Sequence, residues 1–489
     1  MKLSDEQIRA LADAVARNLG LTPDGPAAAA SPSPGGDGSA ESGTGIALRD
    51  GIFTTIDAAV AAAEEAFQAF SAMKLERRDA IIAAIRAAMR EHGEMLARRA
   101  HEETGLGRVE SKIVKNRLVT EKTPGTEALQ PRTWSGDHGL TLVERAPYGV
   151  IAAITPTTNP TSTIICNTIG MLAAGNAVVF NVHPNATRVS CLNIQLLNQA
   201  IQSAGGPPNL VTGIDRPTVE SAQALMGHPG VRLLVVTGGP GVVKAAMASG
   251  KRAICAGAGN PPAVVDETAD IAKAARDIVF GASLDNNVIC TDEKEVFVVD
   301  DVADELIREM QAAGAVLISP VQMRQLERVI FTETRGPRKP GVINRTFIGK
   351  NPSVILREIG MTVPDSVPLA IAEVPVDHPL IWTEQMMPIL PIARVEDADE
   401  GIDLAVQAEH GFRHTASMHS KNIERLSRMA RVMNCSIFVK NGPNAAGLGY
   451  GGEGYCSFSI ASPTGEGLTG PHSFTRERRC TLVDYFRIV

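Results

Sequence analysis

Seven cysteines are scattered through the 489 residues, and one of them, Cys290, stands in a polar loop. The loop reads DNNVICT over residues 285–291 and lies between a predicted helix and a predicted strand over 296–299. An accessible loop thiolate is a candidate nucleophile. The other cysteines lie in an apolar helix, at strand edges or apart from reactive groups: Cys166, Cys191, Cys255, Cys435, Cys456 and Cys480. Cys290 is therefore the candidate reactive thiol, although on position alone a structural cysteine is the commoner alternative.

A glycine-rich segment joins a predicted strand over 231–236 to a predicted helix over 242–249. Its residues are Thr237, Gly238, Gly239, Pro240 and Gly241. Glycines let the backbone approach a pyrophosphate at a helix N-terminus, where free N–H groups and the dipole favour an anion. A plain tight turn is the alternative. The glycines within 447–452 and 257–259 are not dinucleotide fingerprints, because neither set lies between a strand and a helix.

Strand–turn–helix units fill the middle of the chain. Strands are predicted over 150–154, 177–180 and 231–236, with helices ending near 171 and covering 188–204 and 242–249. This alternation predicts an α/β fold with a parallel, doubly wound sheet. Ala-rich helices over 56–72 and 75–103 precede it, a second α/β run covers 295 to about 439, and residues 478–489 suggest an edge strand.

Composition narrows the class of protein. A chain of 489 residues predicts two or three domains. A formal charge of −7 and 4% aromatic residues argue against nucleic-acid binding. No apolar run approaches the ~18 residues of a membrane span, and no secretory signal is evident. Scattered cysteines without metal-type pairs fit a reducing cytosol and predict no metal site.

The first 45 residues differ from the rest. Apolar residues recur at helical spacing over 1–20, which predicts a short amphipathic helix: Leu3, Ile8, Leu11, Val15 and Leu19. Residues 21–45 are rich in Pro, Ala, Ser and Gly and predict a disordered linker. Two interpretations fit equally: a frayed helix on a disordered tail, or a docking peptide whose apolar stripe lies in a partner's groove.

From about residue 46 to the end, the chain resembles the aldehyde dehydrogenase superfamily. It is most similar to the coenzyme-A-acylating branch, especially the propionaldehyde and acetaldehyde dehydrogenases of bacterial microcompartments. Six motifs in order carry the resemblance: residues 154–160, 237–241, 257–262, 285–290, 383–388 and 462–468. The resemblance implies a Rossmann-like cofactor domain, an α/β catalytic domain and an oligomerisation arm.

The resemblance also implies roles for single residues. Cys290 would be the nucleophile, and the Asn159 amide would form an oxyanion hole with the Cys290 backbone N–H. Glu384 would hold the nicotinamide ribose. The other implied cofactor residues are Thr155, Pro156, Pro388, Thr237, Gly238, Gly239 and Gly241. From the residues alone, the alternative for Asn159 is a turn-forming asparagine, and the alternative for Glu384 is a solvated surface carboxylate.

One departure from the superfamily bears on the second substrate. Hydrolytic members carry a water-activating glutamate where this sequence has Ala256. Alanine cannot accept a proton, so an acyl thioester should persist until coenzyme A attacks it. The cofactor lysine common in the superfamily is also absent, with Asn181 and His183 in that region. His414 is the histidine that would accept the thiol proton of coenzyme A, and a hydrogen-bonded structural histidine is the alternative.

These inferences predict a division of the chain and a reaction. We expect a docking helix (1–20), a linker (21–45), an NAD-binding domain (46–133 and 150–258), a catalytic domain (259–455) and an oligomerisation arm (134–149 and 456–489). A short-chain aldehyde, propanal or acetaldehyde, would be oxidised with NAD to a thioester on Cys290. The acyl group would then pass reversibly to coenzyme A. The expected location is cytoplasmic, inside a microcompartment, with a shell protein contacting residues 1–20 and a dimer or tetramer formed through the arm.

Three alternatives stay open on sequence alone: a hydrolytic enzyme that releases the free acid, a protein that serves chiefly as a docking component, and an acyl-phosphate reductase. Ethanal and propanal differ by one methylene, worth only ~1–3 kcal/mol in a pocket, so the sequence does not distinguish them. It also leaves open NAD against NADP and dimer against tetramer.

Overall fold

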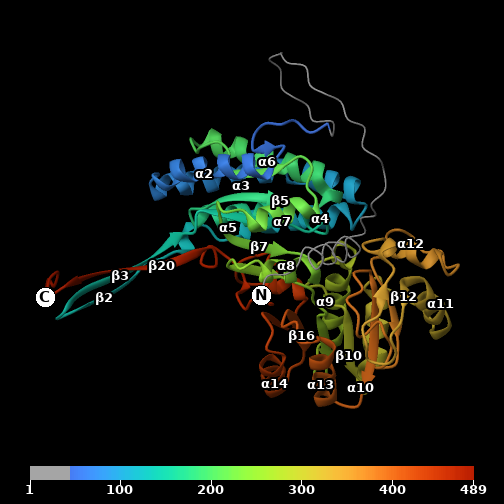
Figure 1. Cartoon of the computed structure of the whole chain (residues 1–489). Coiled ribbons are helices and arrows are strands. Elements are labelled where there is room, and N and C mark those ends of the chain that lie inside the picture. Colours follow the sequence, from blue (N-terminus) through green and yellow to red (C-terminus); the bar gives the residue numbers. More distant parts are fainter. Residues whose placement is uncertain (1–44) are drawn as a thin grey trace.

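The computed structural model describes residues 45–489, and two parallel sheets dominate it (Figure 1). The first sheet has six strands in the order β1-β6-β5-β4-β7-β8. The chain moves outward from β4 to β5 and β6, and then to the other side through β7 and β8. This confirms the predicted doubly wound sheet and puts its switch point between β4 and β7. In sheet order the strands are Ile52–Phe53, Val211–Ile214, Ala177–Asn181, Val150–Ile154, Val231–Thr237 and Ala253–Ala256.

Helices cover both faces of this sheet. The predicted Ala-rich helices are α2 (Ile56–Ser71) and α3 (Leu75–Thr104), and α3 ends at Gly105 in the left-handed conformation that a C-terminal glycine provides. In Figure 1 they form the upper layer together with α6. The remaining helices are α4 (Val109–Lys122), α5 (Pro160–Ala173), α6 (Thr187–Ser203), α7 (Val219–Gly227) and α8 (Pro240–Ala248). Every residue of α5 is buried, so α5 is the centre of this half.

The second sheet has seven parallel strands in the order β11-β14-β15-β10-β9-β16-β17. They cover Val316–Leu317, Ala370–Glu373, Ile389–Val395, Glu295–Val299, Pro262–Val265, Thr415–His419 and Ile437–Lys440. Alternate residues of these strands enter two separate apolar cores. One core contains α9 (Ile271–Ser283) and α10 (Asp300–Ala312). The other contains α11 (Pro320–Ile330), α12 (Pro352–Arg357), α13 (Ala398–Ala408) and α14 (Ile423–Met433).

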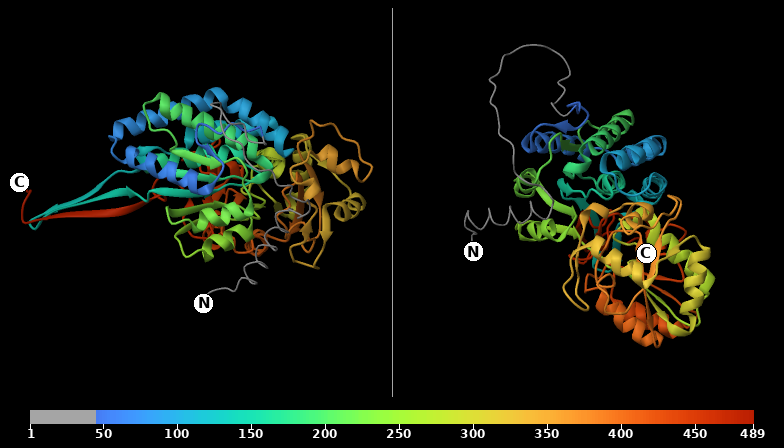
Figure 2. Two further views of the ribbon diagram at one scale, coloured as in Figure 1. Left: turned by 45° about the horizontal axis from the view of Figure 1, so that its top comes forward. Right: turned by 90° about the vertical axis from the view of Figure 1, so that its right-hand side faces the viewer.

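A three-stranded antiparallel arm projects from the body (Figures 1 and 2). It consists of β2 (Arg132–Gly136), β3 (Gly139–Pro147) and β20 (Thr475–Val483). We expected the last strand over 478–489. It begins earlier and stops at Val483, because Asp484 and Phe486 have φ values of 67° and 79° that cannot continue a strand. Two short antiparallel pairs complete the strands: β12 (Phe331–Glu333) with β13 (Val342–Ile343), and β18 (Ile460–Ala461) with β19 (Gly467–Leu468).

The two sheets lie within the ranges expected for the cofactor and catalytic domains, whose boundaries stay predictions. The predicted helix over 1–20 and the linker up to residue 44 lie outside the described residues. Within residues 45–489, no helix is long and apolar enough to cross a membrane.

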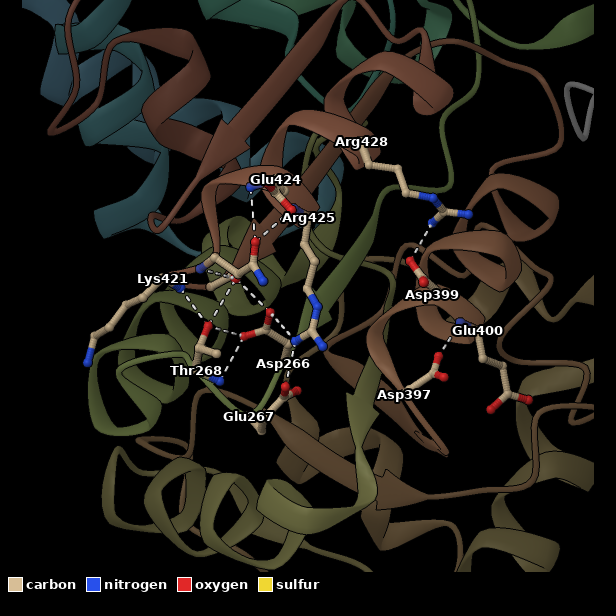
Figure 3. Close-up of polar contacts among 12 residues, drawn as sticks. Asp266, Glu267, Thr268, Asp397, Asp399, Glu400, Lys421, Glu424, Arg425 and Arg428 are labelled. Atoms are coloured by element: carbon tan, nitrogen blue, oxygen red, sulfur yellow. Dashed lines mark hydrogen bonds and ion pairs between the residues drawn. The ribbon is translucent and has the colours of Figure 1, made fainter.

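The carboxyl edge of the seven-stranded sheet near β9 and β16 is occupied by a polar network (Figure 3). Asp266, directly after β9, accepts hydrogen bonds from Ser420 Oγ (2.6 Å), Thr268 Oγ1 (2.6 Å) and Arg425 Nη1 (3.1 Å). The same guanidinium also donates to Glu267 at 2.6 Å. These polar groups satisfy one another through hydrogen bonds and ion pairs.

Candidate active site

Three predicted chemical residues, and with them Gly259, precede neighbouring strands of the seven-stranded sheet. Glu384 comes before β15, Cys290 before β10, Gly259 before β9 and His414 before β16. Those four strands are adjacent, in the order β15-β10-β9-β16. Because the amino ends of parallel strands meet at one edge, residues far apart in the sequence come together there.

Gly259 is the point where these residues meet. A Cβ atom at this position would lie 2.7 Å from the Cys290 carbonyl oxygen and 2.9 Å from Cγ of the His414 ring. Its backbone N–H donates to Oε1 of Glu384 at 3.3 Å. Only a residue without a side chain permits this approach. Our sequence reasoning gave Gly259 no role of its own, although it lies in one of the six motifs.

Gly259→Ala should therefore lower the rate of aldehyde oxidation by about tenfold to a hundredfold. The added methyl group would push the Cys290 backbone or the His414 ring, and a displacement of about 1 Å near reacting groups costs rates of that order. Steady-state kinetics checks this, with a thermal melt to confirm folding. Gly257→Ala is the matched control, since its Cβ would meet only the edge of Pro463 at 3.0 Å. Equal rates for wild type and Gly259→Ala would contradict the expectation.

Cys290 is half-buried, and its thiol is protonated at neutral pH. Burial raises the pKa of the Cys290 thiol to about 12, and the nearby charge of Glu384 raises it further, while Lys294 opposes both. Lys294 also holds the loop, because its Nζ donates to the carbonyl oxygens of Asn287 (2.9 Å) and Ile289 (3.0 Å). The loop is thus fixed before any ligand binds.

This protonation state predicts the alkylation behaviour of the ligand-free protein. Between pH 7 and 9 the iodoacetamide rate at Cys290 should rise about tenfold per pH unit, because only the thiolate reacts and the pKa lies above this range. Peptide mass spectrometry after timed labelling would measure it. A plateau below pH 8 would show that the thiolate is already stabilised and would contradict the prediction.

The residues before Cys290 adopt an uncommon backbone. Three consecutive residues, 285–287, have φ values of 50°, 56° and 66°. Asp and Asn enter this left-handed region more readily than most residues. Their side chains are also tied down: Asn286 donates to the Gly349 carbonyl at 2.9 Å, and Asn287 donates to that of Ala282 at 2.8 Å. The DNN sequence is therefore what directs the chain toward Cys290.

Asn159 is the N-cap residue of α5 and is buried. Its Nδ2 donates to Thr158 Oγ1 at 3.2 Å, and its Oδ1 accepts from Lys115 Nζ at 2.6 Å. Lys115 also pairs with Asp285. The sequence analysis missed this lysine. The available signal was helical spacing that places four polar residues of α4 on one face, the face that the structure buries: Lys112, Lys115, Asn116 and Thr120.

The carboxyl edge of the six-stranded sheet carries most of the predicted cofactor residues. Thr155 and Pro156 follow β4, and residues 237–241 run from the end of β7 into α8, so both lie at the switch point. Gly239 is the N-cap of α8, and the buried Thr155 Oγ1 has no hydrogen-bond partner in the described structure. Free N–H groups and an unpaired hydroxyl at a switch point fit a dinucleotide pyrophosphate.

Pro388 lies apart from that edge. It is buried just before β15, and its carbonyl accepts from Ala370 N at 3.0 Å. Its predicted cofactor role stays a prediction.

His414 is buried, and its environment disfavours the charged ring. Burial, followed by the charge of Lys294, lowers the pKa of His414 to about 3. Its Nδ1 lies 2.9 Å from Thr415 Oγ1 and its backbone N–H donates to Glu409, while Nε2 has no hydrogen-bond partner among residues 45–489. An imidazole with this pKa is a weak acceptor for a thiol proton, so these contacts favour the structural alternative for the ligand-free state.

Known proteins are similar to this chain over most of its length. The model of the aldehyde dehydrogenase family matches residues 47–322. Acetaldehyde dehydrogenase (acetylating) EutE of Salmonella typhimurium is 51% identical over 440 residues, which cover 90% of this chain and 94% of the relative. The solved propionaldehyde dehydrogenase of Rhodopseudomonas palustris, with bound CoA and an acylated cysteine, is 50% identical with a TM-score of 0.86, covering 89% of this chain and 99% of that one.

A second solved structure is a propionaldehyde dehydrogenase from the fucose utilisation bacterial microcompartment of Clostridium phytofermentans. It is 49% identical with a TM-score of 0.87, and the match covers 90% of this chain and all of that one (100%). The resemblance and the fold inferred from the sequence are thereby confirmed. The sequence motifs, the strand orders and the near-complete coverage agree, and the chain belongs to the aldehyde dehydrogenase family.

Proposed function

We propose that this protein is an NAD-dependent, coenzyme-A-acylating aldehyde dehydrogenase for a short-chain aldehyde, propanal or acetaldehyde. The observation that carries the proposal is the position of Cys290, in a loop held by hydrogen bonds beside the predicted cofactor-binding edge. At that edge, Ala256 stands where hydrolytic members of the family have a water-activating glutamate. Ala256 ends β8, is 5% exposed, and its carbonyl accepts from Gly238 N at 3.1 Å. The acetylating and propionaldehyde-oxidising relatives support the same reaction.

In the first half of the proposed reaction, the Cys290 thiol releases its proton to water, and its sulfur forms a bond to the aldehyde carbon. The carbonyl oxygen gains negative charge, which the Asn159 Nδ2 and the Cys290 backbone N–H would stabilise. Thr155, Glu384 and residues 237–241 would hold NAD, which when bound supplies the acceptor for the aldehyde hydride. The product of this half is an acyl thioester on the Cys290 sulfur.

In the second half, the coenzyme A thiolate attacks the acyl carbon, and the Cys290 sulfur leaves. One thioester replaces another, so the free-energy change is small and the reaction is reversible. A carboxylate at position 256 would instead draw a proton from water and direct the acyl group to the free acid. Glu384 is not free for that task, because it accepts from Gly259 N and is assigned to the ribose.

Rapid mixing with aldehyde and NAD tests this proposal. Without coenzyme A we expect a burst of one NADH per active site followed by almost no turnover, and with coenzyme A steady production. Steady NADH formation without coenzyme A, at a comparable rate, would support the hydrolytic alternative and overturn the proposal. Inorganic phosphate should not replace coenzyme A, and sustained turnover with it would favour an acyl-phosphate reductase.

We propose that the arm makes the protein a homo-oligomer. Within residues 45–489, strand β2 is paired on one side only, and four of its five residues are exposed. Val483 and Tyr485 at the arm's tip are also exposed (59% and 73%), an apolar surface suited to a second copy. Light scattering should give a dimer or tetramer. A monomer at micromolar concentration would contradict the proposal.

We also propose that residues 1–20 dock the enzyme on a microcompartment shell protein, as the predicted amphipathic helix suggests. The microcompartment origin of one relative supports this. A fluorescent protein fused to residues 1–45 should gather at shells in cells that make them. A dispersed fusion would overturn the docking proposal, and the enzyme lacking residues 1–45 should keep its activity.

A further inference from the structure

Two lysines on α4 are buried against a single carboxylate. Lys112 and Lys115 are 2% and 3% exposed, and both contact Oδ2 of Asp285, which is fully buried. Asp285 also accepts from the backbone N–H of Arg108 at 2.7 Å. A buried ammonium group is costly unless it is paired, and one lysine would neutralise one carboxylate. The second ammonium group therefore has to be explained by another contact.

That contact is with Asn159. Nζ of Lys115 lies 2.6 Å from Oδ1 of Asn159, and Lys112 makes no such hydrogen bond in the described structure. A side-chain amide has one end that donates and one that accepts, and the two orientations differ by a half-turn about the last side-chain bond. A protonated lysine can only donate, so it selects the orientation with Oδ1 toward itself. Nδ2 is then directed away from the lysine.

Lys115 also joins the two halves of the site. Asn159 begins α5 at the carboxyl edge of the six-stranded sheet, whereas Asp285 lies in the loop that leads to Cys290 in the other sheet. The lysine contacts both residues across sequence separations of 44 and 170 residues. It thus fixes the orientation of the amide and the separation between the amide and the thiol loop.

We propose that Lys115 is a positioning residue for the oxyanion site: it presents Nδ2 of Asn159 to the acyl oxygen and, through Asp285, holds the amide in register with Cys290. This inference rests on the proposed function, since it deepens the first half of that reaction. Lys115 itself transfers no proton and touches no reacting atom in this scheme.

Lys115→Met tests the proposal, with Lys112→Met as the matched control. Methionine keeps much of the apolar length but donates nothing. Asp285 retains one lysine and the Arg108 N–H in either variant, so the carboxylate stays paired and folding should persist. We expect the rate of the first-turnover NADH burst to fall about ten- to a hundredfold in Lys115→Met at saturating aldehyde, with little change in the aldehyde concentration needed for half-saturation. Lys112→Met should lose far less.

A double-mutant cycle separates positioning from a general structural effect. If Lys115 acts through the amide, Lys115→Met should have almost no further effect on the burst rate in an Asn159→Ala background. Additive losses, equal losses in the two lysine variants, or a wild-type burst rate in Lys115→Met would each overturn the proposal. The burst involves no coenzyme A, so failure of the coenzyme A assignment would appear separately, as steady turnover without it.

A pH profile provides a second test that leaves Lys115 in place. Burial lowers the pKa of Lys115 to about 8. The negative charges of Asp285 and Asp292 oppose this shift, and the positive charge of Lys112 adds to it. Below pH 8 the protonated lysine only donates, and above it the neutral amine can also accept. The burst-rate ratio of wild type to Asn159→Ala should therefore fall several-fold as pH rises through about 8. A constant ratio from pH 6.5 to 9.5 would contradict the proposal.

Discussion

Replacing Cys290 with alanine should abolish aldehyde oxidation, lowering NADH formation by at least about 10⁴-fold. The proposed first step forms a bond to the Cys290 sulfur, and no other group can substitute for it within the same geometry. The variant should still fold, because the loop around it is held by Lys294 and by the side chains of residues 285–287. Stopped-flow absorbance with aldehyde, NAD and coenzyme A measures the loss.

The control for this change is another thiol. Cys480 is exposed on β20 in the arm, so Cys480→Ala should keep full activity while removing an exposed thiol. Intact-protein mass spectrometry in the presence of aldehyde and NAD should show one added acyl group on wild type and on Cys480→Ala, and none on Cys290→Ala. Acylation or substantial turnover in Cys290→Ala would exclude Cys290 as the nucleophile.

Asn159→Ala should lower kcat by about 10²- to 10³-fold, the usual loss for one oxyanion donor. The aldehyde KM should change little, because the contact strengthens only as negative charge develops on the oxygen. The free energy of unfolding should fall by about 1–3 kcal/mol, because the side chain makes no capping hydrogen bond to α5 but its Oδ1 is an acceptor for the buried Lys115 ammonium group. Steady-state kinetics with coenzyme A present, together with a thermal melt, measures both effects.

Asn159→Asp is the informative companion. It keeps the shape and can pair with Lys115, but a carboxylate has no N–H to donate and adds negative charge near the developing oxyanion. It should be at least as impaired as the alanine variant. Activity within about threefold of wild type in either variant would remove Asn159 from the oxyanion site.

The sequence predicted three adjacent strands of the six-stranded sheet, β5, β4 and β7, because they are mainly apolar and bounded by turns. It missed β1, β6 and β8, which have only two to four residues each. The strand over 150–154 matches β4 at both ends, and the helices over 56–72 and 75–103 match α2 and α3 to within a residue. Strand β9 was not predicted. It has four residues and begins at the second of two prolines, a signal that we used only to exclude a helix.

The site was predicted unevenly, because its contacts are long-range. Loop position alone made Cys290 a candidate, whereas Asn159 and Glu384 were assigned only through resemblance to a family. The bond from Gly259 to Glu384 spans 125 residues, and that from Lys115 to Asn159 spans 44. No local pattern records such pairings. The alternative that Glu384 is a solvated surface residue fits poorly, because its carboxylate is half-buried and accepts a hydrogen bond from a backbone N–H.

The pairing of β3 with β20 has a consequence for how the protein is made. Thr141 and Thr481 lie 3.0 Å apart through their hydroxyl oxygens although 340 residues separate them. At about 5–20 residues per second, a ribosome takes roughly 20 to 70 s to synthesise that stretch. During this time the nascent β2–β3 hairpin exposes a strand edge that nothing yet covers, so chaperone binding or contact with a neighbouring nascent chain would act on the arm before the rest of the enzyme is complete.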